Sequence, residues 1–117
     1  MRRVVTLAAL AGCLTLPANA ASFDCAAAKA PDEIAVCGNA RLSELDSEMG
    51  ALWFAYRAIP MMMGANGARQ DEARAFLQDR ATCGGNGACL TKLYAARIAA
   101  LKSGITAAVA TCGPATP

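Results

Sequence analysis

The side chains with the widest scope for chemistry in this 117-residue sequence carry sulfur, since it has six cysteines, five methionines and no histidine. The lack of histidine excludes Ser-His-Asp triads, histidine metal sites and a histidine general base. No C-x-x-C motif is present, so the cysteines favour structural disulfides over a metal or redox centre. We therefore expect no metal and no cofactor.

Three consecutive methionines, Met61, Met62 and Met63, are the first candidate binding residues. Thioethers are soft ligands, and a methionine cluster in an exported protein could hold Cu(I). The simpler interpretation is a flexible apolar tip between two helices, which could also contact a partner. Asn86, in the glycine-rich loop Gly84–Gly87, is the other candidate.

Ionisable residues give little support for catalysis. Neighbouring carboxylates such as Asp71 and Glu72 are typical of a solvated helix surface, and the serines have no base, so we expect no enzyme. Arg80 differs because it lies on the apolar side of its predicted helix. We expect its guanidinium either to meet a carboxylate, with Asp46 as the candidate, or to extend to water.

Residues 1–20 have the pattern of a secretory signal peptide. Arg2 and Arg3 precede the apolar run Val4–Leu16, and a small-x-small cleavage site ends at Ala20. The alternative is a lipoprotein acylated at Cys13. Both interpretations place the chain in the periplasm or outside the cell, where disulfides persist.

Removal of the signal peptide changes the charge balance. Loss of Arg2 and Arg3 lowers Lys+Arg from 11 to 9, which equals the 9 Asp+Glu. A net charge near zero argues against a nucleic-acid partner, which requires a basic surface.

Five cysteines remain after such cleavage: Cys25, Cys37, Cys83, Cys89 and Cys112. Spacing favours two local bridges, one clamping the Cys83–Cys89 turn and one joining Cys25 to Cys37. Closing the second loop would contribute roughly 2.5–3 kcal/mol by the loop-entropy model. A long-range Cys37–Cys83 bridge is the rival pairing. Cys112 is then left free or intermolecular.

The apolar spacing predicts an all-α domain over residues 21–110, followed by a flexible tail over 111–117. We expect a short helix starting at Pro31 and longer helices over about 43–59, 68–82 and 88–108, with Ser43 capping the first of the longer ones. No stretch alternates like a strand, and no apolar run reaches the roughly 18–20 residues of a membrane span. Short connections favour antiparallel neighbours. The predicted architecture is a helical hairpin with a third helix packed against it, stabilised by disulfides.

With these residues in view, the chain resembles the N-terminal domain of the LprI-type lysozyme inhibitors, a family of small bacterial envelope proteins. The resemblance is carried by four spaced segments: Ser22–Cys25, Glu33–Cys37, Leu42–Asp46 with Tyr56, and Arg74–Cys83 followed by Cys89, Tyr94 and Arg97–Ile98. Phe76 stands where the family usually has tryptophan, and Ala81 where an aspartate is common.

The resemblance implies an exported, disulfide-linked helical domain that inhibits a lysozyme by occluding its cleft. Two other functions are also compatible with this sequence. One is a copper- or redox-responsive envelope protein using Met61–Met63 and Cys112, and the other is a structural envelope module. A local acidic patch of Asp71, Glu72 and Asp79 would help an inhibitor meet a basic lysozyme.

Overall fold

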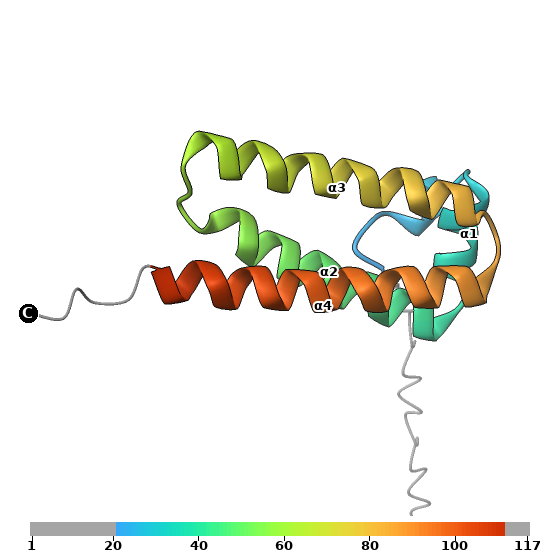
Figure 1. The fold of residues 1–117 in the computed structure, drawn as a ribbon. Helices are drawn as coiled ribbons and strands as arrows, with labels where there is room; N and C mark the ends of the chain where they lie inside the picture. Colours follow the sequence, from blue (N-terminus) through green and yellow to red (C-terminus); the bar gives the residue numbers. More distant parts are fainter. Residues whose placement is uncertain (1–20, 112–117) are drawn as a thin grey trace, which may run out of the picture.

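The computed structural model describes residues 21–111, and it contains only helices in that range (Figure 1). A 3-10 turn, η1 (Cys25–Ala27), precedes α1 (Pro31–Gly38), α2 (Ala40–Ala58), α3 (Met63–Cys83) and α4 (Gly87–Thr111). The all-α prediction is confirmed. The predictions for the signal peptide, Cys13 and Cys112 fall outside the described residues.

The three long helices form an up-down-up arrangement. α2 and α4 run in the same direction, and α3, which follows α2 in the chain, runs antiparallel to both (Figure 1). α4 packs most extensively against α2 and also contacts α3, whereas α2 and α3 have little direct contact. α4 therefore holds α2 and α3 together, although these two helices are themselves splayed apart.

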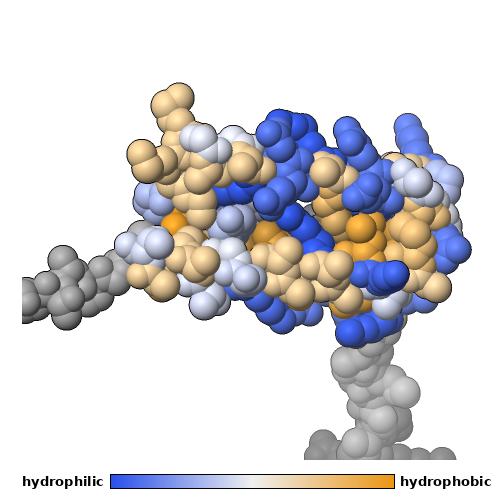
Figure 2. Space-filling model, in the orientation of Figure 1, coloured by the Kyte–Doolittle hydropathy of each residue, from blue (hydrophilic) through white to orange (hydrophobic). Residues whose placement is uncertain are grey.

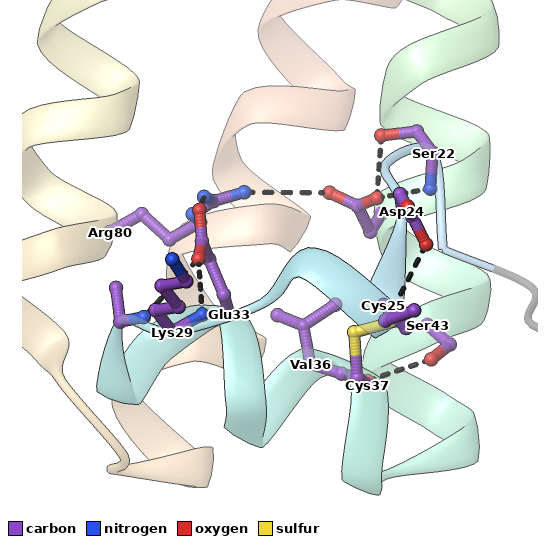
Figure 3. Close-up of a disulfide and its surroundings, with 12 residues drawn as sticks. Ser22, Asp24, Cys25, Lys29, Glu33, Val36, Cys37, Ser43 and Arg80 are labelled. Atoms are coloured by element: carbon purple, nitrogen blue, oxygen red, sulfur yellow. Dashed lines mark hydrogen bonds and ion pairs between the residues drawn. A yellow bond between two sulfur atoms is a disulfide. The ribbon is translucent and has the colours of Figure 1, made fainter.

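Two helices start earlier than the sequence indicates. α2 begins at Ala40 because the side chain of Asn39 accepts from the Leu42 amide at 3.0 Å. Ser43, the predicted cap, is instead buried, and its hydroxyl donates to the Val36 carbonyl at 2.7 Å, which ties α2 to α1 (Figure 3). α3 begins at Met63 rather than near residue 68, so two glycines lie inside its first turns.

α1 is short and lacks a capping side chain at Ala30. Glu33 compensates, since its carboxylate accepts from the backbone amides of Lys29 at 3.0 Å and Ala30 at 3.2 Å (Figure 3). These two hydrogen bonds lower the pKa of Glu33 below its ordinary value. Glu33 thus ties the two residues that precede α1 to the first turn of the helix.

The hydrophobic core lies toward the end of the bundle that α1 covers. The buried apolar residues are Val36, Leu42, Leu45, Phe76, Leu90, Tyr94, Ile98 and Leu101. Tyr94 packs edge-on against Phe76, with ring centroids 5.2 Å apart. The apolar side chains of α2 are fully buried only in its first half, since Trp53 and Tyr56 are half-buried.

α4 is also long and apolar enough to cross a membrane by length and composition alone. Length and composition are weak evidence for a membrane span, because the core helix of a soluble protein meets the same two criteria. Two of its three basic side chains pair with other helices: Arg97 lies 3.2 Å from Glu72 of α3, and Lys102 lies 2.7 Å from Glu48 of α2.

Candidate functional site

The four cysteines in residues 21–111 form two disulfides. Cys25–Cys37 joins η1 to α1 (Figure 3), and Cys83–Cys89 joins the end of α3 to the start of α4. These are the two local bridges that the spacing favours, and the rival Cys37–Cys83 bridge is absent. The second disulfide spans a turn in which Gly84 has a φ of 54°, a conformation that favours glycine. Two disulfides are typical of proteins in oxidising compartments outside the cytoplasm.

Arg80 lies at the centre of a buried polar cluster. Its Nε donates to Asp32 at 2.7 Å, while its Nη1 lies 3.8 Å from Asp46. Glu33 lies 3.9 Å from Nη2, so the expected carboxylate, Asp46, is one of three carboxylates around the guanidinium. Asp32, in the first turn of α1, is the closest partner, and the sequence analysis did not single it out. The ring of Phe23 covers the guanidinium at 5.2 Å.

Asp46 connects this cluster to the N-terminal segment. Its carboxylate is fully buried and accepts from the Tyr94 hydroxyl at 2.7 Å. The amide and hydroxyl of Ser22 both donate to its second oxygen at 2.6 Å. The carboxylate thus joins α2, α4 and the chain preceding η1.

The electrostatics of this cluster favour a structural role. Burial and the hydrogen bond to Asp46 raise the pKa of the Tyr94 phenol well above its usual value. Burial alone would lower the pKa of Arg80, but its hydrogen bonds to Tyr94 and Asp32 outweigh that effect and raise it. In residues 21–111 no buried side-chain polar atom lacks a hydrogen-bond partner. The cluster offers no free base and no open position for a substrate.

A second buried arginine, which the sequence analysis missed, closes the other end of α2. Arg69 of α3 donates to the carbonyls of Tyr56, Arg57 and Ile59 at 2.7–3.0 Å. Its Nε donates to the Asn66 side chain at 2.9 Å. Because helix C-termini carry unsatisfied carbonyls and partial negative charge, one guanidinium both caps and neutralises this end.

A solvent-open groove lies between α3 and α4. Two adjoining hollows of about 330 and 230 Å³ share Asp79, Leu93 and Ala96, and together they form what we call the α3–α4 groove. Phe76 and Leu93 supply its apolar floor, and Figure 2 shows strongly hydrophobic side chains at the bottom of the hollow between these helices. The Cys83–Cys89 disulfide closes one end.

The rims of the α3–α4 groove carry opposite charges. Glu72 and Asp79 line it from α3, while Lys92 and Arg97 line it from α4. The Glu72–Arg97 pair spans the two helices at 3.2 Å. Sequence periodicity could not show this groove, because it arises where small side chains meet between two helices.

The predicted binding residues do not come together. Asn86 caps α4, since its side chain accepts from the Cys89 amide at 3.0 Å. Met62 is the N-cap of α3, without a side-chain hydrogen bond, and Met63 is the first residue of that helix. Both side chains are exposed, whereas Met61 is half-buried. The tip is thus partly helical rather than a loop through Gly67.

No cluster of three or more His, Cys, Asp or Glu residues that could hold a metal occurs within residues 21–111. Comparisons with protein-family models, with curated proteins and with solved structures find no match for this chain.

Proposed function

We propose that this chain is an exported, non-enzymatic binding domain that occludes the cleft of a partner protein, and that the partner is a lysozyme. The observation that carries the proposal is the α3–α4 groove, an apolar concavity with charged rims. Ligand and partner sites are commonly concave, apolar and bordered by a few polar groups. The buried ionisable groups, by contrast, are engaged with one another.

Rigidity supports a binding role for this groove. Its closed end is fixed by Cys83–Cys89, and its floor residue Phe76 packs on the buried Tyr94. A preorganised surface loses less conformational entropy on association than a flexible one. A partner side chain could therefore enter the groove without reorganising the helices.

The acidic patch on α3 is weaker than its sequence indicates. Asp71 pairs with Arg74, and Glu72 pairs with Arg97. Asp79 makes no ion pair within the described part of the chain and remains to attract a basic partner. Long-range steering of a basic lysozyme is then small, and the shape of the groove has to provide most of the affinity.

The choice of lysozyme as partner rests on the resemblance to the LprI-type inhibitors. Residues that carry it lie beside the groove or beneath it: Cys83 and Cys89 line it, while Tyr94 and Arg80 support its floor from the core. The same residues would serve a structural envelope module, which would bind a partner without inhibiting a lysozyme.

A groove-blocking variant tests the proposal. Ala96 is exposed and lines both hollows, so Ala96→Arg fills the groove without entering the core. Ala95→Arg is the matched control, since Ala95 is exposed on the same helix and lines neither hollow. We expect the wild type and Ala95→Arg to inhibit muramidase activity at micromolar levels and Ala96→Arg to lose inhibition. Absence of inhibition against several lysozyme types would remove the lysozyme assignment.

A further inference from the structure

The end of the bundle opposite α1, which we call the distal end (residues 53–70 and 103–111), exposes large apolar side chains. Met62 is 86% exposed, Met63 92%, Phe54 65% and Val109 57%. Among the described residues only Ile34 and Leu77 are other large apolar residues with comparable exposure. Figure 2 shows pale orange side chains projecting from this end, near the start of α3.

The distal end also has no carboxylate side chain. The sequence contains no Asp or Glu from Met49 to Gln70, and α4 contains none at all. The two cations at this end are Arg57 and Arg69. Arg69 is buried against the end of α2, whereas Arg57 is exposed with its guanidinium 5.2 Å from the ring centroid of Phe54. The distal end is therefore both apolar and positive.

We propose that the distal end inserts shallowly into the surface of an anionic lipid bilayer. Met62, Met63 and Phe54 enter the boundary of the acyl chains, and Arg57 stays at the level of the phosphates. Peripheral membrane contacts combine buried apolar area with electrostatic attraction to anionic lipids. An arginine stem lies along apolar surface while its guanidinium remains in the polar layer.

The geometry favours a bilayer over a second protein. A stable protein interface uses about 20–30 residues on each side, and the distal end offers four exposed apolar side chains. A fluid bilayer accepts a small convex tip without matching its shape. Beside the tip is a solvent-open hollow of about 310 Å³ lined by Pro60, Met61, Met62, Ala65, Ala108 and Thr111. This mostly apolar hollow offers room for part of an acyl chain.

Shallow contact agrees with the packing of α4. The helix stays joined to α3 through Arg97–Glu72 and to α2 through Lys102–Glu48. A spanning orientation would break both pairs and strip Tyr94 from the buried cluster. Contact through the distal end leaves the α3–α4 groove free, so membrane binding and partner binding are separable.

Co-sedimentation with vesicles tests the proposal, using vesicles of equal parts phosphatidylglycerol and phosphatidylcholine and vesicles of phosphatidylcholine alone. We expect Met62→Gln with Met63→Gln to weaken binding about tenfold or more. Arg57→Gln should lower binding to the anionic vesicles about fivefold and have little effect on the neutral ones. Ile34→Gln is the matched control, because Ile34 is 56% exposed but lies on α1, away from the distal end. This substitution should change binding to neither kind of vesicle. The N-terminus of the purified chain has to be determined, since Val4–Leu16 would itself bind lipid.

Trp53 provides an internal probe, because it is the only tryptophan and lies beside Phe54. Brominated lipid should quench its fluorescence in the wild type and not in the double methionine variant, with equal thermal midpoints showing that both are folded. The proposal is overturned by wild type that binds neither vesicle, or by a double variant that binds as well as the wild type. It is also overturned by a dimer that these substitutions dissociate while vesicle binding is absent, which would assign the tip to self-association.

Discussion

Arg69 holds Tyr56 through two different contacts. Its Nη1 donates to the Tyr56 carbonyl at 2.7 Å, and its guanidinium lies 5.6 Å from the centroid of the Tyr56 ring. The contact fixes the start of α3 against the end of α2. It explains why α3 can begin at Met63 although Gly64 and Gly67 disfavour helix there.

Replacement of Arg69 by Met should destabilise the domain strongly. The substitution keeps an unbranched apolar stem but leaves the carbonyls of Tyr56, Arg57 and Ile59 without their donor. We expect the free energy of unfolding to fall by about 3 kcal/mol, measured by urea denaturation. Arg57→Met is the control, because the Arg57 side chain is exposed, and it should change the value by less than about 0.5 kcal/mol. Equal effects of the two variants would show that Arg69 is not the cap.

The distance between Tyr56 and Gly104 predicts opposite results for the same substitution at two glycines. A Cβ at Gly104 would lie 3.0–3.2 Å from the Tyr56 ring, whereas a Cβ at Gly67 would meet nothing within 4 Å. Gly104→Ala should therefore cost about 1–3 kcal/mol, because α2 or α4 has to shift. Gly67→Ala should stabilise by about 0.5–1 kcal/mol through helix propensity. Thermal unfolding of both variants checks the signs, and stabilisation by Gly104→Ala would mean that the α2–α4 contact is looser than described.

Parts of this fold are readable from the sequence, and the reasons differ by element. Leu90, Tyr94, Ile98 and Leu101 follow helical spacing, so the buried face of α4 is predictable from periodicity alone. The disulfides follow from local spacing, since their cysteines are separated by 12 and 6 residues. Local patterns suffice where the interaction itself is local.

Long-range partners are harder to predict for a physical reason. Arg80 and Asp32 are 48 residues apart, and nothing in either helix indicates which carboxylate will be nearer. Arg69 binds backbone carbonyls, and carbonyls have no signature in the sequence. Ser43 fits the pattern of a helix cap, yet it lies one turn inside α2 because Asn39 supplies the cap first.

The two disulfides should contribute unequally to stability. In the loop-entropy model, replacing Cys25 and Cys37 by Ser should lower the free energy of unfolding by about 3 kcal/mol, and replacing Cys83 and Cys89 by about 2 kcal/mol, because the second loop is shorter. Urea denaturation of each double variant gives the values. Both are best made in a Cys112→Ser background, which removes the odd thiol and prevents exchange. A fully reduced chain with unchanged stability would contradict the role given to both bridges.

The copper alternative makes a separate prediction about Met61–Met63. Within residues 21–111, Met62 and Met63 are exposed at the tip and no cluster of other metal-binding side chains lies beside them. If the tip is a surface contact, replacing all three methionines by Leu should leave Cu(I) binding unchanged in a competitive titration. A loss of tight, stoichiometric Cu(I) binding in that variant would restore the copper-responsive function, with Cys112 as the next ligand to replace.

Tyr94 should make the domain sensitive to alkali. Its phenol is held neutral by burial and by the hydrogen bond it donates to Asp46, so its pKa in the folded state is raised above the reference value of 10.0. A group with a raised folded pKa contributes stability that is fully present below the unfolded pKa. We therefore expect the free energy of unfolding to fall as the pH rises above about 10, where only the unfolded chain ionises.

Tyr94→Phe separates this effect from general alkaline damage. At neutral pH the variant should be less stable by about 1–3 kcal/mol, because Asp46 loses one of its donors in a buried site. Its stability should nevertheless decline less steeply above pH 10, since the residue that ionises on unfolding is gone. Urea denaturation across this pH range measures both effects, and ultraviolet difference titration against the wild type reports the phenol directly. Parallel stability curves for the two proteins would show that the Tyr94 hydroxyl is not shielded by the Asp46–Arg80 cluster.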